Sequence, residues 1–161
     1  MPNVIHFKPK KCTLCRRCEA ACSNKHFNVF TSFYSKIKAV EFEDEQSYFP
    51  VTCFQCDDAP CISACPTSAI VKDSETGIVT INEDECTGCG NCIDECPIKH
   101  IFPYDDFGHA IKCDYCGGDP ECVKFCKDRA IEWREITPEE KEGRDQLFTT
   151  LADKLKEVKE L

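Results

Sequence analysis

The sequence predicts a small α+β protein that is rich in loops, is built from tandem nested modules and ends in a helix. Three observations support this fold class. Of the 161 residues, 16 are cysteines, and they fall into four groups of four. Short runs of β-branched residues lie between the groups, as expected for short strands. The last 25 residues lack cysteine and carry apolar residues at helical spacing.

The cysteine groups are four copies of one unit, and no cysteine is left over. The first and third copies have the spacing Cys-x2-Cys-x2-Cys-x3-Cys, by which bacterial ferredoxins hold a 4Fe-4S cluster. The second and fourth copies lengthen the middle gap to four and five residues. Four copies predict four 4Fe-4S clusters. The copies are Cys12, Cys15, Cys18 and Cys22; Cys53, Cys56, Cys61 and Cys65; Cys86, Cys89, Cys92 and Cys96; and Cys113, Cys116, Cys122 and Cys126.

The fourth cysteine of such a run binds the neighbouring cluster, so the copies are expected to work in pairs. Cys65 and Cys96, which end the second and third copies, are each followed by proline. Cys22 and Cys126, which end the first and fourth copies, are not. This shared departure indicates that the first and fourth copies pair with each other around the inner pair. The predicted parts are an outer ferredoxin-like module (1–50 and 105–136), an inner one (51–104) and a C-terminal amphipathic helix (137–161).

Isoleucines recur at a fixed distance from the cysteines. Ile70, Ile101 and Ile131 each lie five positions past the last cysteine of a copy. We expect a short helical turn at this point, running into a strand, with the isoleucine packed over a cluster. Such packing excludes water, and solvent exposure is one of the factors that set a reduction potential.

The segments between the copies predict further strands. Two β-branched runs in residues 70–81, joined by a turn at Gly77, are typical of a hairpin. A strand is expected over residues 36–43, with a bulge where two apolar residues, Ala39 and Val40, follow each other. A turn is expected at 44–47. The aromatic residues of 27–34 are expected to supply the small protein core.

The C-terminal helix has a clear predicted start. Thr137 stands at the N-cap, Pro138 at the first helical position and Glu140 three residues after the cap, which is a capping box. An apolar stripe follows and reaches Val158. A terminal amphipathic helix of this kind packs either on its own body or on another subunit, and the sequence leaves both open.

Zinc and disulfides are the competing explanations for the cysteines. Structural zinc sites draw cysteine pairs from separate knuckles, whereas each group here lies within 11 to 14 residues. Disulfide scaffolds are secreted, and the N-terminus lacks the apolar core of a signal peptide. No apolar run is long enough to span a bilayer. Iron–sulfur clusters are therefore favoured, in a protein expected to be cytoplasmic and anaerobic. A 3Fe-4S cluster at one site is left open.

The charge is distributed unevenly along the chain. The net charge is −9, but residues 1–38 carry eight Lys or Arg and only one acid. Bound clusters add further negative charge, about −2 for each oxidised site with four thiolates. Nucleic acid is therefore excluded as an expected partner. The basic N-terminal face either guides docking onto an acidic patch or is a solvated surface beside the clusters.

The sequence shows no catalytic motif. It contains no Gly-rich phosphate loop, no flavin or nicotinamide fingerprint and no nucleophile with a base. Adjacent acids such as Asp57 and Asp58 are typical of a solvated surface in a chain with 29 acids. The four histidines are expected at the surface or beside clusters, because each cluster already has four thiolates. We therefore expect a non-catalytic electron-transfer protein. The histidines are His6, His26, His100 and His109.

The motifs resemble a known family. Residues 49–70 and 84–97 are similar to the second and third motifs of four-cluster iron–sulfur subunits, and the resemblance covers residues 9–131. Such subunits accompany molybdenum or tungsten bis-pterin catalytic subunits, as in formate dehydrogenases, dimethyl sulfoxide reductases and aldehyde oxidoreductase relatives. They are also found in some hydrogenases. The short chain resembles the small subunits of soluble tungsten enzymes, including benzoyl-CoA reductase relatives. A free-standing polyferredoxin and a hydrogenase subunit are the alternatives.

The resemblance also implies how the cysteines are shared. Each cluster would take three cysteines from one copy and the fourth from its paired copy. The implied ligand sets are Cys12, Cys15, Cys18 with Cys126; Cys113, Cys116, Cys122 with Cys22; Cys53, Cys56, Cys61 with Cys96; and Cys86, Cys89, Cys92 with Cys65. Four clusters in a row would form an electron relay to a catalytic subunit, with a further electron-carrier protein as a possible partner.

Overall fold

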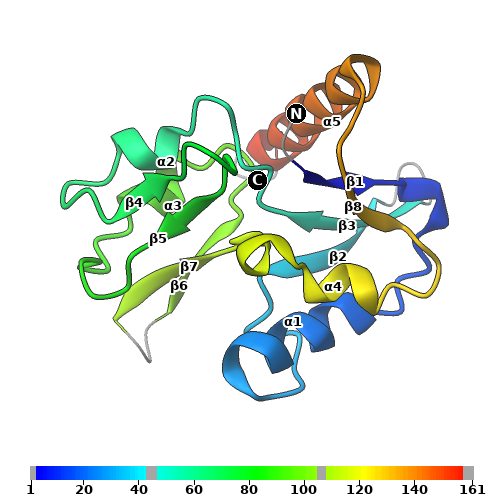
Figure 1. Cartoon of the computed structure of the whole chain (residues 1–161), viewed down its shortest axis with the longest axis horizontal. Coiled ribbons are helices and arrows are strands. Elements are labelled where there is room, and N and C mark those ends of the chain that lie inside the picture. The colour runs from blue at the N-terminus through cyan, green and yellow to red at the C-terminus, as the bar shows by residue number, and fades with distance from the viewer. Residues whose placement is uncertain (1–2, 43–46, 105–107, 158–161) are drawn as a thin grey trace. The chain divides into compact units, whose positions relative to one another are not determined.

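A computed structural model describes residues 3–42, 47–104 and 108–157. It divides the chain into two compact units (Figure 1). Unit 1 consists of Met1–Cys53 and Cys113–Glu135, and unit 2 consists of Phe54–Lys112 and Ile136–Leu161. Each unit is therefore made of two segments that are distant in sequence. The α+β fold class with short hairpins, many loops and a C-terminal helix is confirmed.

Unit 1 is held together by two antiparallel strand pairs. The first strand pairs with the last strand of the unit, in the register Ile5↔Trp133, and so joins its two chain segments. The buried Phe49 contacts Phe7 edge to face, with ring centroids 5.5 Å apart. The elements of unit 1 are β1 (Val4–Phe7), η1 (Pro9–Lys11), α1 (Arg17–Phe27), β2 (Ile37–Phe42), β3 (Ser47–Thr52), η3 (Tyr115–Gly118), α4 (Glu121–Lys124) and β8 (Ile131–Arg134).

Unit 2 contains two more hairpins, and Figure 1 shows β4 beside β5 and β6 beside β7. Its core combines aliphatic residues, such as Ile70, Val79 and Ile101, with the buried cysteines Cys61 and Cys92. The elements of unit 2 are α2 (Pro60–Ser63), β4 (Ile70–Lys72), β5 (Val79–Ile81), α3 (Asn91–Glu95), β6 (Ile101–Tyr104), β7 (His109–Lys112) and α5 (Pro138–Glu157).

Helix α5 packs on its own unit. The ring of Phe148 lies 5.4 Å from that of Phe54, and the guanidinium of Arg144 lies 4.8 Å above the same ring. Lys141 forms an ion pair of 3.0 Å with Asp57. Leu151 is buried on the same helix. Of the two positions that the sequence left open for this helix, the structure therefore shows packing on the chain's own body.

Several local predictions can be compared with the structure. The hairpin of residues 70–81 is confirmed, with Ile70 paired to Ile81. The predicted bulge is wrong, because β2 and β3 pair without interruption through Ala39↔Pro50 and Val40↔Phe49. The turn residues 44–46 and Val158 lie outside the described residues.

The predicted aromatic core of residues 27–34 is only partly present. Phe27 and Tyr34 are half-buried and contact each other, with ring centroids 5.6 Å apart. Phe30 and Phe33 are 79% and 77% exposed, so for them the prediction is wrong. The core of unit 1 is formed by residues of the strands and of η3 instead, such as Phe49 and Tyr115.

The capping box of α5 is confirmed. The amide of Glu140 donates to Thr137 Oγ1 over 3.3 Å, and the amide of Thr137 donates to Glu140 Oε2 over 3.0 Å. Replacing Thr137 with Ala is expected to cost the helix start about 1 kcal/mol, which corresponds to about fivefold faster amide exchange in its first turn. Hydrogen exchange with Thr149→Ala as control checks this, because the Thr149 hydroxyl only donates to a carbonyl within the helix. Equal exchange in both variants would contradict it.

Candidate metal centres

The third cysteine of every copy lies in the same local structure. It is the second residue of a short or medium helix in all four copies, and it is buried there. The strand after the copy then begins with the predicted isoleucine in three cases, and these isoleucines are 1% to 3% exposed. These third cysteines are Cys18 in α1, Cys61 in α2, Cys92 in α3 and Cys122 in α4.

The backbone conformation of the cysteine loops also repeats in all four copies. The residue two positions after the first cysteine has a positive φ in each copy, from 51° to 66°. This left-handed conformation turns the chain tightly between the first and second cysteines, so that both thiols can face one side of the loop. The left-handed conformation costs about 1–2 kcal/mol at a residue other than glycine, so the backbone is strained at three of the four positions. These residues are Leu14, Gln55, Gly88 and Tyr115.

One cavity in unit 1 gathers the first ligand set implied by the resemblance. Cys12, Cys15 and Cys18 line it together with Cys126, which comes from the other chain segment of the unit. Ile131, the isoleucine five positions past Cys126, also lines this cavity. The predicted packing of an isoleucine over a cysteine site is therefore seen here.

A second cavity, in unit 2, is lined by an equivalent set of cysteines and an isoleucine. Three cysteines of the third copy, Cys86, Cys89 and Cys92, line it together with Cys65 of the second copy. Ile70, the isoleucine five positions past Cys65, is again among the lining residues. This cavity brings together the fourth implied set.

Cys22 lies near the cysteines of the fourth copy in unit 1. Burial raises the pKa of Cys122 well above its usual value, and the nearby thiolates of Cys113, Cys22 and Cys116 raise it further. The thiolate of Cys18, which belongs to the first implied set, raises this pKa as well, so the charge effects indicate that Cys22 lies in the neighbourhood of the fourth copy but do not by themselves assign it to one set. In unit 2, Cys56, Cys61 and Cys96 belong to one apolar cluster of side chains. Cys53, the remaining member of that set, is the last residue of the first segment of unit 1.

The thiols need cations in order to ionise. Burial raises the pKa of Cys18 and Cys113 to about 12 and that of Cys92 to about 11. Thiols with such pKa values stay protonated at neutral pH, and bound metal ions remove the protons. Groups of four thiols, partly enclosed by apolar side chains, are the donor set that a 4Fe-4S cluster requires. The residues present therefore fit this cofactor.

Backbone amides point at the fourth cysteine of three copies. The amide of Ala130 donates to Cys126 Sγ over 3.2 Å, and that of His100 donates to Cys96 Sγ over 3.4 Å. Burial alone would raise the pKa of Cys65, but hydrogen bonds from Thr67, Ile70 and Ala69 lower it overall. In these three copies one of the donors, Ala130, His100 or Ala69, lies four residues past the cysteine. N–H···S bonds stabilise negative charge on sulfur, and they are one of the factors that set the reduction potential.

Polar side chains lie beside Cys22 and Cys116, and of these Lys36 and Asp114 were not predicted from the sequence. Lys36 is buried, its amide donates to Cys22 Sγ over 3.3 Å, and its ammonium lies 3.4 Å from Asp114. His26 Nε2 lies 3.6 Å from Cys116 Sγ, which agrees with a histidine beside a cluster site. No local pattern marks Lys36, because its neighbours come from other elements of the fold.

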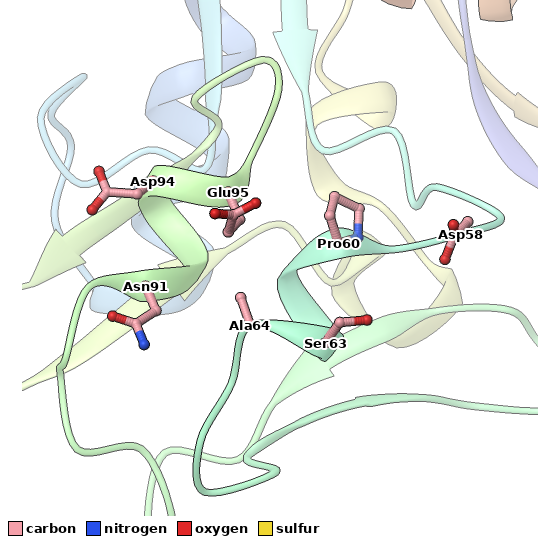
Figure 2. Close-up of a pocket in the computed structure, with 7 residues that line it drawn as sticks. All are labelled: Asp58, Pro60, Ser63, Ala64, Asn91, Asp94 and Glu95. Atoms are coloured by element: carbon pink, nitrogen blue, oxygen red, sulfur yellow. The ribbon is translucent and has the colours of Figure 1, made fainter.

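A pocket in unit 2 is lined by acids and carries no cysteine. It has a volume of about 530 Å³ and is widely open to solvent. Figure 2 shows Asp58, Asp94 and Glu95 on its walls, which are formed by α2, α3 and the segment before α2. Besides the three carboxylates, its lining residues offer the hydroxyl of Ser63 and the amide of Asn91, and none of the cysteines. The adjacent acids Asp57 and Asp58 are exposed, in agreement with the sequence analysis.

The fold and the cysteine sites define an iron–sulfur protein. A family profile described as a 4Fe-4S dicluster domain matches residues 44–136, and one described as a 4Fe-4S binding domain matches residues 9–25. The chain belongs to the 4Fe-4S dicluster family. It is an electron-transfer subunit that carries 4Fe-4S clusters, and its 16 cysteines fit four of them.

Two relatives identified by sequence support this assignment. The polyferredoxin-like subunit of an aliphatic sulfonate oxidoreductase from Pyrococcus furiosus is 41% identical over 124 residues, which are 77% of this chain and 71% of that relative. Protein NrfC of Escherichia coli is 33% identical, and the match spans 78% of this chain but 61% of NrfC. Among solved structures, the active site complex BamBC of benzoyl coenzyme A reductase contains a chain that is 26% identical, with 99% and 97% of the two chains covered and a TM-score of 0.47.

Within the three described ranges, no helix is both long enough and apolar enough to cross a membrane.

Proposed function

We propose that this chain relays single electrons between a tungsten or molybdenum bis-pterin catalytic subunit and an external donor or acceptor. When bound, each 4Fe-4S cluster would accept and release one electron. The proposal rests on the four repeated cysteine sites, because their arrangement requires several clusters within one small chain. The relative from Pyrococcus furiosus, a subunit of an aliphatic sulfonate oxidoreductase, supports a catalytic partner.

The ligand sets are part of the proposal. The cavity in unit 1 supports a cluster held by Cys12, Cys15, Cys18 and Cys126. The cavity in unit 2 supports the set of Cys65 with the third copy. The thiolate of Cys22 raises the pKa of Cys113, Cys116 and Cys122, which supports the set of Cys22 with the fourth copy. The remaining set, Cys53, Cys56, Cys61 and Cys96, follows from the repeat and from the family resemblance.

Anaerobic purification tests the function. We expect about sixteen irons and as much acid-labile sulfide per chain, which would contradict a zinc module. We also expect a larger pterin-containing subunit to co-purify. A fully loaded chain that remains alone under the same conditions would favour a free-standing polyferredoxin, and a nickel–iron partner would favour a hydrogenase. Growth without oxygen and a cytoplasmic location are proposed for the same complex, because exposed cluster ligands such as Cys15 are sensitive to oxidation.

Two cysteine variants form a matched test of the ligand sets. Cys22→Ser is expected to damage the cluster of Cys113, Cys116 and Cys122 and to leave that of Cys12, Cys15 and Cys18 intact. Cys126→Ser is expected to do the reverse, because its sulfur lies in the cavity of the first copy. Each variant should lose one of the four cluster signals in EPR redox titrations. If both variants lost the same signal, the nested pairing would be wrong.

A further inference from the structure

The exposed end of the first cysteine site is surrounded by positive charge. Among the three cysteines that open the first copy, Cys18 is buried, Cys12 is half-buried and Cys15 is exposed. Arg16 and Arg17 follow Cys15 directly and line the cavity that it shares with Cys12, Cys18 and Cys126. A cluster in this cavity would therefore come closest to solvent beside two guanidinium groups.

The other chain segment of unit 1 extends the same surface. The hydroxyl of Thr13 donates to Asp128 over 2.7 Å, and the amide of Lys8 donates to the carbonyl of Ala130 over 2.7 Å. These bonds hold residues 8–17 against residues 127–130, next to the β1–β8 pair (Figure 1). We call the exposed basic residues of these two segments the basic rim. It consists of Lys10, Lys11, Arg16, Arg17, Lys127 and Arg129.

Most of this charge is available to a partner. Lys8 is paired with Glu132 over 2.6 Å, so it is left out of the rim. Arg16 lies 3.9 Å from the buried carboxylate of Glu19. Lys10, Lys11 and Arg17 are exposed, and within the described ranges their side chains make no ion pair. Asp128 is the one acid in residues 8–17 and 127–130, and the nearest acid after residue 17 is the buried Glu19.

The equivalent loop of the third copy has the opposite character. Cys89 is exposed like Cys15, but Gly90 and Asn91 stand where Arg16 and Arg17 follow Cys15. Residues 83–95 contain five exposed acids and no base. Because the fold of the two loops is the same, the local structure does not require the arginines. The charge at the first copy is thus a separate feature of its surface.

We infer, on the basis of the proposed function, that the basic rim is the docking surface for an acidic electron-carrier protein, which exchanges electrons with the cluster of the first copy. The carrier gives up one electron to this cluster, or takes one from it, and no bond is made or broken. Encounters between electron-transfer proteins use small interfaces, so long-range attraction contributes much of their rate. The six exposed cations of the rim lie on the two chain segments that carry Cys12, Cys15 and Cys126, and such a surface is complementary to a carrier with an acidic face.

The test measures electron exchange with two donors of opposite charge. The holoprotein, in its complex, is mixed in a stopped-flow instrument with a reduced, acidic two-cluster bacterial ferredoxin, or with the reduced methyl viologen cation. The test variant replaces Lys10, Lys11 and Arg129 with Gln, and Arg16 and Arg17 are kept because they line the cavity of the first cysteine site. The control variant replaces Lys25, Lys124 and Lys141 with Gln, which changes the net charge equally outside the rim.

We expect the rim variant to react with the ferredoxin at least about tenfold more slowly at low ionic strength, with the difference shrinking as salt is added. The control variant should stay within about twofold of the unmodified protein, and reduction by methyl viologen should not slow in either variant. Equal ferredoxin rates for the rim variant and the control would overturn the inference, as would a failure of the ferredoxin to react with a protein that viologen reduces. If viologen also fails to reduce any cluster, the proposed function itself fails.

Discussion

Replacing Gly88 with Ala is expected to abolish the cluster held by Cys65 and the third copy. Gly88 has a φ of +66°, and a Cβ added there would lie 2.6 Å from the carbonyl oxygen of Gly108. Such a contact with backbone relaxes only if the loop that carries Cys86 and Cys89 moves away from Gly108 or the backbone at Gly108 moves away from it, and either shift alters the cavity, which is lined by Gly88 and by Ala110. The anaerobically purified variant should therefore lack about four of the sixteen expected irons.

Gly90 supplies the control for this change. It also has a positive φ, +83°, but a Cβ at this position meets no atom within 4 Å. Gly90→Ala therefore adds backbone strain of about 1–2 kcal/mol without a clash, and it should keep its full iron content. The comparison separates steric exclusion from strain. A Gly88→Ala protein with the same iron content and visible spectrum as Gly90→Ala would contradict the geometry of this loop.

Much of the fold could be predicted because its determinants are local. The cysteine repeat, the hairpin of residues 70–81 and the capping box at Thr137 each depend on residues a few positions apart. The left-handed turns could be anticipated only at Gly88, since Leu14 and Tyr115 adopt the same conformation without being glycine. At Leu14 and Tyr115 the cysteine loop imposes a left-handed backbone conformation, which residues other than glycine disfavour.

Features that depend on distant residues could not be read from the sequence. The pairing of β1 with β8 joins strands more than 120 residues apart in the sequence, so no local pattern predicts this strand pair. The burial of Lys36 beside Cys22 depends on Asp114, which comes from the other segment of unit 1. Phe30 and Phe33 have core-like chemistry but are exposed, because Phe49 and other strand residues fill the core. The predicted domain boundaries and the full ligand sets stay predictions.

Removing the iron is expected to unfold both units. In the part of each unit that the structure describes, every sheet has two strands, and a two-stranded hairpin is marginally stable by itself in water. Buried cysteines stand where an ordinary core would have aliphatic residues, for example Cys61 and Cys92 in unit 2. A single structural metal site can contribute about 10–16 kcal/mol, which matches or exceeds the about 5–15 kcal/mol of stability that a whole domain usually has.

The measurement is amide hydrogen exchange, before and after anaerobic extraction with an iron chelator and a thiol reductant. The reductant prevents disulfides from replacing the clusters as cross-links. Amides of β1 and β8 in unit 1, and of β4 and β5 in unit 2, should lose their protection together. Amides of α5 should lose protection as well, because this helix packs on Phe54, which directly follows the cluster ligand Cys53 in the chain. Adding ferrous iron and sulfide should restore the protection, which distinguishes loss of the clusters from irreversible damage. An iron-free chain that keeps protected hairpins would show that the polypeptide core is sufficient, because the clusters would then add redox chemistry to a fold that exists without them.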